Sequence, residues 1–365
     1  MTSSRRPAPK PDPAESPAPR GRASTHNPVN RFVQIGQHRD LEAYVDPEAP
    51  SPKTQFLEAK ARTILSYNDS PDVGPGVTIN AYRGCEHGCI YCYARPTHET
   101  FGFSAGLDFE TKILVKPNAP ELLRKELSAK KWKPEPIMMS GVTDCYQPAE
   151  KRFGITREVL KVLLEFRNPV CVITKNHLVT RDIDLLSELA SFNAVKVFLS
   201  ITTLQKELCQ WMEPRTSLPS MRLDAVRQLA EAKIPVGVNV APLIPGLTDH
   251  EMPLILKASA EAGAKRAGYV PVRLPYGVAE LFEKWLHEHY PDRAQKVIHR
   301  IQEMRGGKMN DANFHSRMEG KGVFADQFRI LFSAACRKYG LNDGEGMPLS
   351  TAHFRRYQGP DLFET

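Results

Sequence analysis

The sequence lacks any long hydrophobic run. A membrane-spanning helix needs about 18 or more consecutive apolar residues, and no such stretch occurs in the 365 residues. The N-terminus also lacks the apolar core of a secretory signal, and its basic residues do not form the amphipathic pattern of a transit peptide. We therefore expect a cytoplasmic protein with no membrane partner.

Cysteine is scarce and unevenly spread, which argues against a disulfide framework. Small secreted chains carry many evenly used cysteines, whereas this chain has seven. Three of them fall within one short segment, and the other four stand alone, at Cys145, Cys171, Cys209 and Cys336. An odd, clustered set in a long chain indicates metal binding in a reducing compartment.

Acidic residues are fewer than basic ones, and the formal net charge is +7 at pH 7. A positive balance is compatible with a nucleic-acid partner, but much of the excess lies near the N-terminus, so charge alone leaves this question open. The first 30 residues hold seven of the 30 prolines, and such a segment buries too little apolar surface to fold. We predict a disordered Pro/Arg-rich tail at 1–30, an extension packing on the core at 31–73, a core at 74–276 and a helical region at 277–365.

Short apolar runs alternate with amphipathic stretches from residue 77 onward. Several runs are continuous, as expected for strands buried on both faces. The predicted strands cover residues 77–82, 136–142, 169–174, 195–202, 235–241 and 266–272. The predicted helices cover residues 119–130, 156–166, 180–190, 221–233 and 249–262, followed by 281–289, 293–304 and 327–339. This α/β alternation predicts a parallel sheet with right-handed crossovers, either a partial (β/α)6 barrel or an open doubly wound sheet.

Cys85, Cys89 and Cys92 stand in a loop directly after the first predicted strand. A short loop can wrap three soft thiolates around one face of an iron–sulfur cubane, which leaves the fourth iron open for another ligand. A zinc site with His87 or His98 as fourth ligand is the alternative, and three unligated buried cysteines are another. The end of the first strand of an α/β barrel is where active sites are built, and this position favours the cluster.

The spacing Cys-x3-Cys-x2-Cys, with Tyr91 before the last cysteine, resembles the signature of the radical S-adenosylmethionine (SAM) superfamily. The longer block NAYRGCEHGCIYCYARPTH at residues 80–98 resembles the branch grouped with spore photoproduct lyase. Other stretches agree with that branch, namely DFETK at 108–112, GVTDCYQP at 141–148, EP at 213–214, PGLTD at 245–249 and NFHSR at 313–317.

The resemblance implies a partial (β/α)6 TIM-type barrel, and a 4Fe–4S cluster on Cys85, Cys89 and Cys92. In this superfamily the open iron binds SAM, and an electron from the cluster cleaves SAM to a 5′-deoxyadenosyl radical. By the same resemblance we expect a set of cofactor-binding residues after the predicted strands. These are Tyr91 against the adenine, Ser140, Thr143 or Asp144 for the SAM ammonium group, Lys175 for its carboxylate, and Ser200 and Thr202 near the ribose.

Cys145 and Tyr146 are the candidates for a catalytic hydrogen donor, since spore photoproduct lyase uses a cysteine in that role. The alignment does not place Cys145 at the lyase's cysteine, and a buried thiol is more often a small hydrophobe. The leading hypothesis is a radical SAM enzyme that acts on nucleic acid as a repair lyase, with a reductant such as flavodoxin or ferredoxin as partner. The alternatives are modification of a peptide or small metabolite, and a non-catalytic zinc-stabilised protein that binds nucleic acid.

Overall fold

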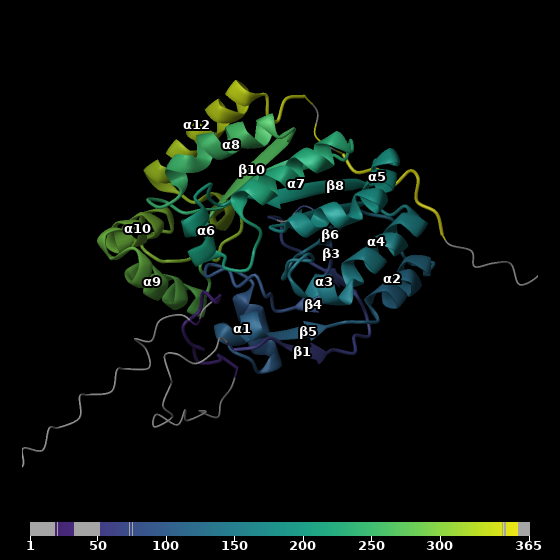
Figure 1. Cartoon of the computed structure of the whole chain (residues 1–365), viewed down its shortest axis with the longest axis horizontal. Coiled ribbons are helices and arrows are strands. Elements are labelled where there is room, and N and C mark those ends of the chain that lie inside the picture. Colours follow the sequence, from purple (N-terminus) through teal and green to yellow (C-terminus); the bar gives the residue numbers. More distant parts are fainter. Residues whose placement is uncertain are drawn as a thin grey trace, which may run out of the picture.

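The computed structural model describes residues 19, 21–32, 52–72, 74, 76–344, 346 and 348–356. In these residues a large sheet is surrounded by helices, and a small sheet lies at one end of the molecule (Figure 1). None of the helices in this part of the chain is long and apolar enough to cross a membrane.

The large sheet contains six parallel strands that lie side by side in the order in which they occur along the chain. These strands are β3 (Val77–Ile79), β6 (Ile137–Met139), β7 (Val170–Thr174), β8 (Val195–Ser200), β9 (Val236–Leu243) and β10 (Arg266–Pro271). A doubly wound sheet reverses its strand order at a switch point, and no reversal occurs among these six strands. The core is therefore a partial barrel of TIM type.

A seventh strand, β2 (Leu65–Tyr67), pairs antiparallel with β3 at the edge of the sheet. The edge strands are thus β2 and β10, and the barrel is open between them. All six predicted strands occur, with ends that differ from the predicted ones by at most three residues. The apolar side chains of these strands are buried on both faces. Helices cover the outside of the barrel, and the inward-pointing side chains pack together inside it.

Helices cover the outside of the barrel (Figure 1). They are α2 (Ala119–Ser128), α4 (Ile155–Phe166), α5 (Ile183–Ser191), α7 (Pro219–Glu231) and α8 (Met252–Glu261). Each helix buries one apolar side. In α4, for example, Val159, Leu160 and Leu163 are fully buried, which is the spacing that places residues on one helix face.

The C-terminal helices pack in two separate places. The long helix α12 (Gly322–Tyr339) packs against α8 beside β10. The pair α9 (Gly277–His289) and α10 (Pro291–Met304) forms a second apolar core, which also contains Cys89, Ile90 and Tyr91. The cysteine loop is therefore packed against the helical region.

A small second sheet was not predicted. Its strands are β1 (Gln55–Glu58), β5 (Lys112–Val115) and β4 (Tyr82–Arg83), with β5 in the centre. The strand β1 runs parallel to β5, and β4 runs antiparallel to it. Because β4 leads directly into Gly84 and Cys85, this sheet fixes the start of the cysteine loop.

The segment 21–32, here called the N-terminal strap, packs on the core. Arg22, Ala23 and Ser24 are buried, and the backbone N–H groups of Ala23 and Ser24 donate to the carboxylate of Glu110. The sequence analysis placed these residues in a tail too polar to pack, and that prediction was wrong for the strap. The packing uses backbone groups and one buried carboxylate, which composition does not reveal. The rest of the predicted tail apart from residue 19, and all of residues 33–51, lie outside the described residues.

Two truncations test the role of the strap. Removing residues 1–32 leaves Glu110 without the strap's hydrogen bonds, each worth about 1.5–3 kcal/mol when the acceptor is charged. We expect the melting temperature to fall by more than about 5 °C, since 1 kcal/mol shifts it by roughly 2–4 °C in proteins of this size class.

Removing only residues 1–18 is the matched control, and we expect an unchanged melting temperature by differential scanning calorimetry. Equal melting temperatures for the two truncated proteins would contradict a structural role of the strap.

Candidate active site

The cysteine loop runs from β4 to a short 3-10 helix, η2 (Arg95–Phe101). Cys85 and Cys89 are buried, Cys92 is half-buried, and all three are free thiols. Gly84 and Gly88 have positive φ angles of 76° and 66°. A Cβ atom at Gly84 would lie 2.9 Å from His98 Cε1, and one at Gly88 would lie 2.8 Å from Glu110 Oε2. Both positions therefore require glycine.

A buried ion pair supports this loop from behind. Arg95 and Glu110 are fully buried and their charged groups lie 2.6 Å apart. The Arg95 guanidinium also donates to the carbonyl oxygens of Cys89 at 2.9 Å and Gly88 at 3.1 Å. Glu110 is the same carboxylate that binds the N-terminal strap. The pair thus connects the backbone of the cysteine loop to the strap.

Thr143 and Gln147 hold the loop from the side of β6. The Thr143 hydroxyl donates to the carbonyl oxygen of Gly84 at 2.6 Å, and the Gln147 amide N–H donates to the same oxygen at 3.1 Å. Gln147 Oε1 accepts from the backbone N–H of Glu86 at 2.9 Å. Sequence reasoning expected Thr143 near the SAM ammonium group and gave Gln147 no role. Its only sequence signal was its place in the stretch at 141–148.

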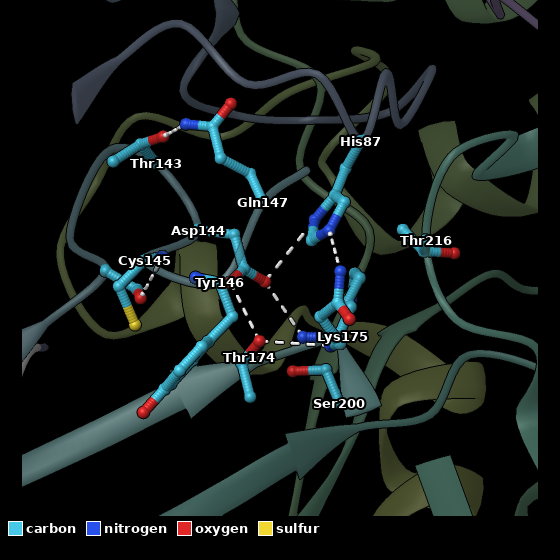
Figure 2. Close-up of polar contacts among 12 residues, drawn as sticks. His87, Thr143, Asp144, Cys145, Tyr146, Gln147, Thr174, Lys175, Ser200 and Thr216 are labelled. Atoms are coloured by element: carbon cyan, nitrogen blue, oxygen red, sulfur yellow. Dashed lines mark hydrogen bonds and ion pairs between the residues drawn. The ribbon is translucent and has the colours of Figure 1, made fainter. Parts of the chain in front are cut away.

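Asp144 lies at the centre of a hydrogen-bonded group (Figure 2). Its carboxylate accepts from the Thr174 hydroxyl and from the backbone N–H groups of Tyr146 and Lys175, each at 2.8 Å. His87 Nδ1 lies 3.4 Å from Asp144 Oδ2. Burial alone would raise the pKa of Asp144, but His87 and the hydrogen bonds hold it below its usual value.

These four contacts use about as many lone-pair positions as a carboxylate has. Asp144 therefore connects the end of β7 to His87 in the cysteine loop. Both of its carboxylate oxygens already have hydrogen-bond partners in the protein. The expectation that Asp144 meets the SAM ammonium group finds no support in this geometry.

Lys175 follows β7 and extends its side chain toward the cysteine loop. Its Nζ donates to the carbonyl oxygen of Ala241 at 2.9 Å and lies 5.8 Å from the centre of the Tyr91 ring. Glu213 Oε1 is 3.7 Å away. Burial lowers the pKa of Lys175 to about 8, although neighbouring acidic groups oppose this shift.

Glu213 connects several of the expected site residues. The Tyr91 hydroxyl donates to its carboxylate, as does Thr202 at 2.7 Å. Arg222 forms a buried ion pair with the same carboxylate and donates to the carbonyl oxygen of Ser200 at 2.9 Å. The structure therefore brings together Tyr91, Lys175, Ser200 and Thr202. The sequence analysis quoted Glu213 without a role and missed Arg222, because a buried ion pair between distant residues has no local pattern.

The histidines are engaged in protein contacts. His87 lies between Asp144 and Asn176, whose amide nitrogen is 3.1 Å from Nε2. His98 Nε2 lies 2.9 Å from the carbonyl oxygen of Lys112. Within the described residues, no three His, Cys, Asp or Glu side chains converge as a site for a single metal ion. The zinc alternative therefore gains no support.

An iron–sulfur cubane does not require such convergence, because each of its cysteines binds a different iron. Burial raises the pKa of Cys89 and raises that of Cys92 to about 11, with contributions from the neighbouring thiols. Ligation requires the thiolate, so metal binding to this loop would release protons.

Cys145 and Tyr146 point away from the site. In Figure 2 the Cys145 sulfur and the Tyr146 ring extend away from Lys175 and His87. Both belong to the main hydrophobic core, and the Tyr146 hydroxyl donates to buried Asp182 at 3.1 Å. A hydrogen donor must reach the substrate, so this placement lends no support to the catalytic role expected for these two residues, which stays a prediction. Ser140, also expected at the ammonium group, accepts from the backbone N–H of Cys145 at 3.0 Å.

Comparison with known proteins agrees with this fold. Residues 79–258 match the family model described as the radical SAM superfamily. An uncharacterized protein of Methanocaldococcus jannaschii is 32% identical over 200 residues, which cover 54% of this chain and 71% of that protein. An uncharacterized protein of Mycobacterium tuberculosis is 35% identical over 217 residues, and the match spans 59% of this chain and 64% of the length of that relative.

Solved structures of spore photoproduct lyase share the fold. One mutant of that lyase superposes with a TM-score of 0.55 at 16% identity, covering 78% of this chain and 80% of the other. A second, with bound AdoMet and dinucleoside spore photoproduct, has the same TM-score, identity and coverage. The chain belongs to the radical SAM superfamily, whose members bind SAM at a 4Fe–4S cluster. Within that superfamily its fold is that of the spore photoproduct lyase branch.

Glu110→Gln tests the support behind the cysteine loop. The change keeps the size of the side chain but leaves the Arg95 charge buried and unpaired, which costs about 3–5 kcal/mol. We expect a matching loss in the free energy of unfolding, measured with urea on the metal-free protein, and a lower iron content after anaerobic reconstitution.

Glu231→Gln is the matched control, because Glu231 pairs with Arg227 at the surface and such pairs contribute about 0–1 kcal/mol. Equal losses in the two variants would show that the buried pair has no special role.

Proposed function

We propose that Cys85, Cys89 and Cys92 hold a 4Fe–4S cluster at which SAM is cleaved reductively. The observation that carries this proposal is the placement of three thiols on a glycine-shaped loop at the carboxyl ends of parallel barrel strands. When bound, the cluster and SAM supply the electron transfer and the radical that begins the reaction. The protein supplies binding, orientation and exclusion of water.

Lys175 is the residue that we propose for the SAM carboxylate. It is an ammonium group held among polar atoms at the end of β7, next to Tyr91, and charge-assisted hydrogen bonds to a carboxylate are strong. Tyr91, Ser200 and Thr202 form the adjoining wall, where an adenosine group would lie. We propose that Thr143 and Asp144 orient the cysteine loop and β7, and that they do so without contacting SAM.

For the substrate class we propose nucleic acid, with a lyase-type repair reaction. This is supported by the shared fold with a lyase whose structures hold a dinucleoside spore photoproduct and by the net charge of +7. A peptide or small metabolite is the competing substrate, and a substrate screen distinguishes these classes. The reaction also requires a one-electron donor, for which we propose flavodoxin or ferredoxin, and the reducing cytoplasm as the setting.

The primary test is anaerobic reconstitution with iron and sulfide, followed by reduction in the presence of SAM. We expect about four irons per chain, as in a cubane thiolate site, and formation of 5′-deoxyadenosine. Changing Cys85, Cys89 or Cys92 to Ala should abolish both.

The controls are Cys171→Ala and Cys336→Ala, which remove buried cysteines outside the loop and should retain the iron. A colourless parent protein with one tightly bound zinc would contradict the proposal.

Lys175→Ala tests the SAM site. Losing a buried charge partner costs about 2–5 kcal/mol, so the variant should keep its cluster absorption and bind SAM tenfold to a thousandfold or more weakly. Equilibrium binding of SAM to the reconstituted protein measures this.

Lys161→Ala is the control, since Lys161 pairs with Glu158 on the surface. SAM affinity within twofold of the parent in Lys175→Ala would remove Lys175 from the proposed site.

A further inference from the structure

The segment between α10 and α12 crosses the open side of the barrel. It contains the short helix α11 (Ser316–Glu319), which contacts β10. Buried Arg305 fixes one end, donating to the carbonyl oxygens of Val272 at 2.8 Å, Ser316 at 3.0 Å and Arg317 at 2.9 Å. We call residues 311–319 the latch.

The other side of the latch binds the loop between β2 and β3. Asp72 in that loop is buried and accepts from the backbone N–H of His315 at 2.6 Å and from the guanidinium of Arg317. Arg317 also donates to the hydroxyl of Ser70 at 2.5 Å. The latch therefore spans the gap between β10 and β2, and it contains the stretch at 313–317 to which the proposed function gives no role.

The backbone of the latch is strained at its centre. His315 has φ 63° and ψ −64°, and the Ser316 N–H donates to the carbonyl oxygen of Phe314 at 2.8 Å. This is a γ-turn of the rare positive-φ kind. Such strain persists where surrounding contacts enforce it, most often at ligand-binding sites. Here it presents the Phe314 ring to solvent at 51% exposure.

Other non-glycine residues with positive φ help to locate the site. Four of those in the described residues lie within three residues after the end of a helix, at Arg167, Asn193, Lys233 and Asn342. The remaining three are Ser140 after β6, Tyr276 after β10, and His315 in the latch. Tyr276 and His315 directly precede helices α9 and α11, whereas Ser140 directly follows β6, and all three lie beyond the carboxyl ends of barrel strands or in the segment that spans the opening.

Arg273 follows β10 at the same opening, and one of its N–H groups has no hydrogen-bond acceptor among the described residues. Its guanidinium lies 5.3 Å from the centre of the Tyr93 ring and 3.3 Å from Met318 Sδ. Its Nε is buried and has no hydrogen-bond partner in the described part of the chain. The nearby carboxylate, Asp72, is already paired with Arg317. A buried N–H without an acceptor is costly, which suits a site that awaits an anion.

One exposed aromatic ring, that of Tyr93, faces this cation, and two further exposed rings face other arginines. Tyr93 directly follows the last cysteine of the loop and is 48% exposed, and its hydroxyl donates to the carbonyl oxygen of Gly141 at 2.8 Å. Phe314 lies under the Arg317 guanidinium at 4.5 Å. Tyr276, 65% exposed, stacks with Arg31 at 3.6 Å.

We propose that Arg273, Tyr93 and Phe314 form a binding site for one nucleotide of a single-stranded or unpaired nucleic acid. Arg273 binds the phosphate, and the base stacks on an exposed ring at the barrel opening. Bases that have left a helix stack on aromatic side chains and arginine planes. An acidic peptide would be bound by cations and would make no use of the exposed rings. The inference rests on the proposed function, because it places nucleic acid beside the cysteine loop.

The test uses the reconstituted full-length protein and fluorescence anisotropy with a labelled 12-nucleotide single-stranded DNA. The comparison ligands are RNA of the same sequence, the DNA duplex, and a polyglutamate peptide. Stacking on one ring contributes about 1–3 kcal/mol per base, so Phe314→Ala should weaken single-strand binding fivefold or more. Arg273→Gln should weaken single-strand binding about tenfold. It should also reduce the slope of log binding constant against log salt concentration by about 0.7, the value for one phosphate contact on a single strand.

Arg167→Gln is the matched control, because Arg167 lies 4.2 Å from the Phe192 ring at the end of α4, in a cation–π pair outside the opening. It should bind within twofold of the parent, and all variants should melt as the parent does. Arg273→Gln and Phe314→Ala both binding within twofold of the parent would overturn the inference. Polyglutamate or duplex binding that depends equally on Arg273 would overturn it too.

A failure of the proposed function is recognised separately. It would appear as no 5′-deoxyadenosine from the reduced parent with SAM, whatever the oligonucleotide affinity.

Discussion

The buried ion pair between Arg95 and Glu110 is the interaction on which the site depends. A cysteine loop that must present three thiols cannot use its own backbone in regular structure, so its carbonyl oxygens need other donors. Arg95 supplies them, and Glu110 compensates the Arg95 charge while accepting from the N-terminal strap. Removing either partner would leave a charge uncompensated in the interior, which proteins tolerate poorly. The loop, the small sheet and the strap therefore form one structural unit.

The second constraint is the sequential order of the parallel strands. Because β6, β7, β8 and β9 end at one rim, residues that are distant in sequence meet there, and the cysteine loop closes over them. Asp144 binds β7 to this loop, and Glu213 connects Tyr91 to Thr202 and Arg222. The same rim continues to Arg273 and the latch, so the cysteine loop and the barrel opening lie side by side.

The sequence predicted the barrel strands well because buried parallel strands are continuous apolar runs. It did not predict β1, β4 or β5, which are two to four residues long and depend on pairing with one another. The cysteine ligands remain a prediction from their spacing. Side-chain direction was not predictable. Cys145 follows Asp144 directly, yet one side chain lies in the core and the other at the site. Composition also hid the strap, whose key contacts come from backbone N–H groups.

The central claim is that three cysteines leave one iron of a cubane open for SAM. Mössbauer spectroscopy of protein reconstituted with iron-57 tests it directly, since each iron of the cluster contributes its own signal. We predict a 4Fe–4S spectrum in which the signal of one iron site changes on addition of SAM while the signals of the other sites do not. A spectrum that is unaffected by saturating SAM, or a protein that takes up no iron cluster, would contradict the account.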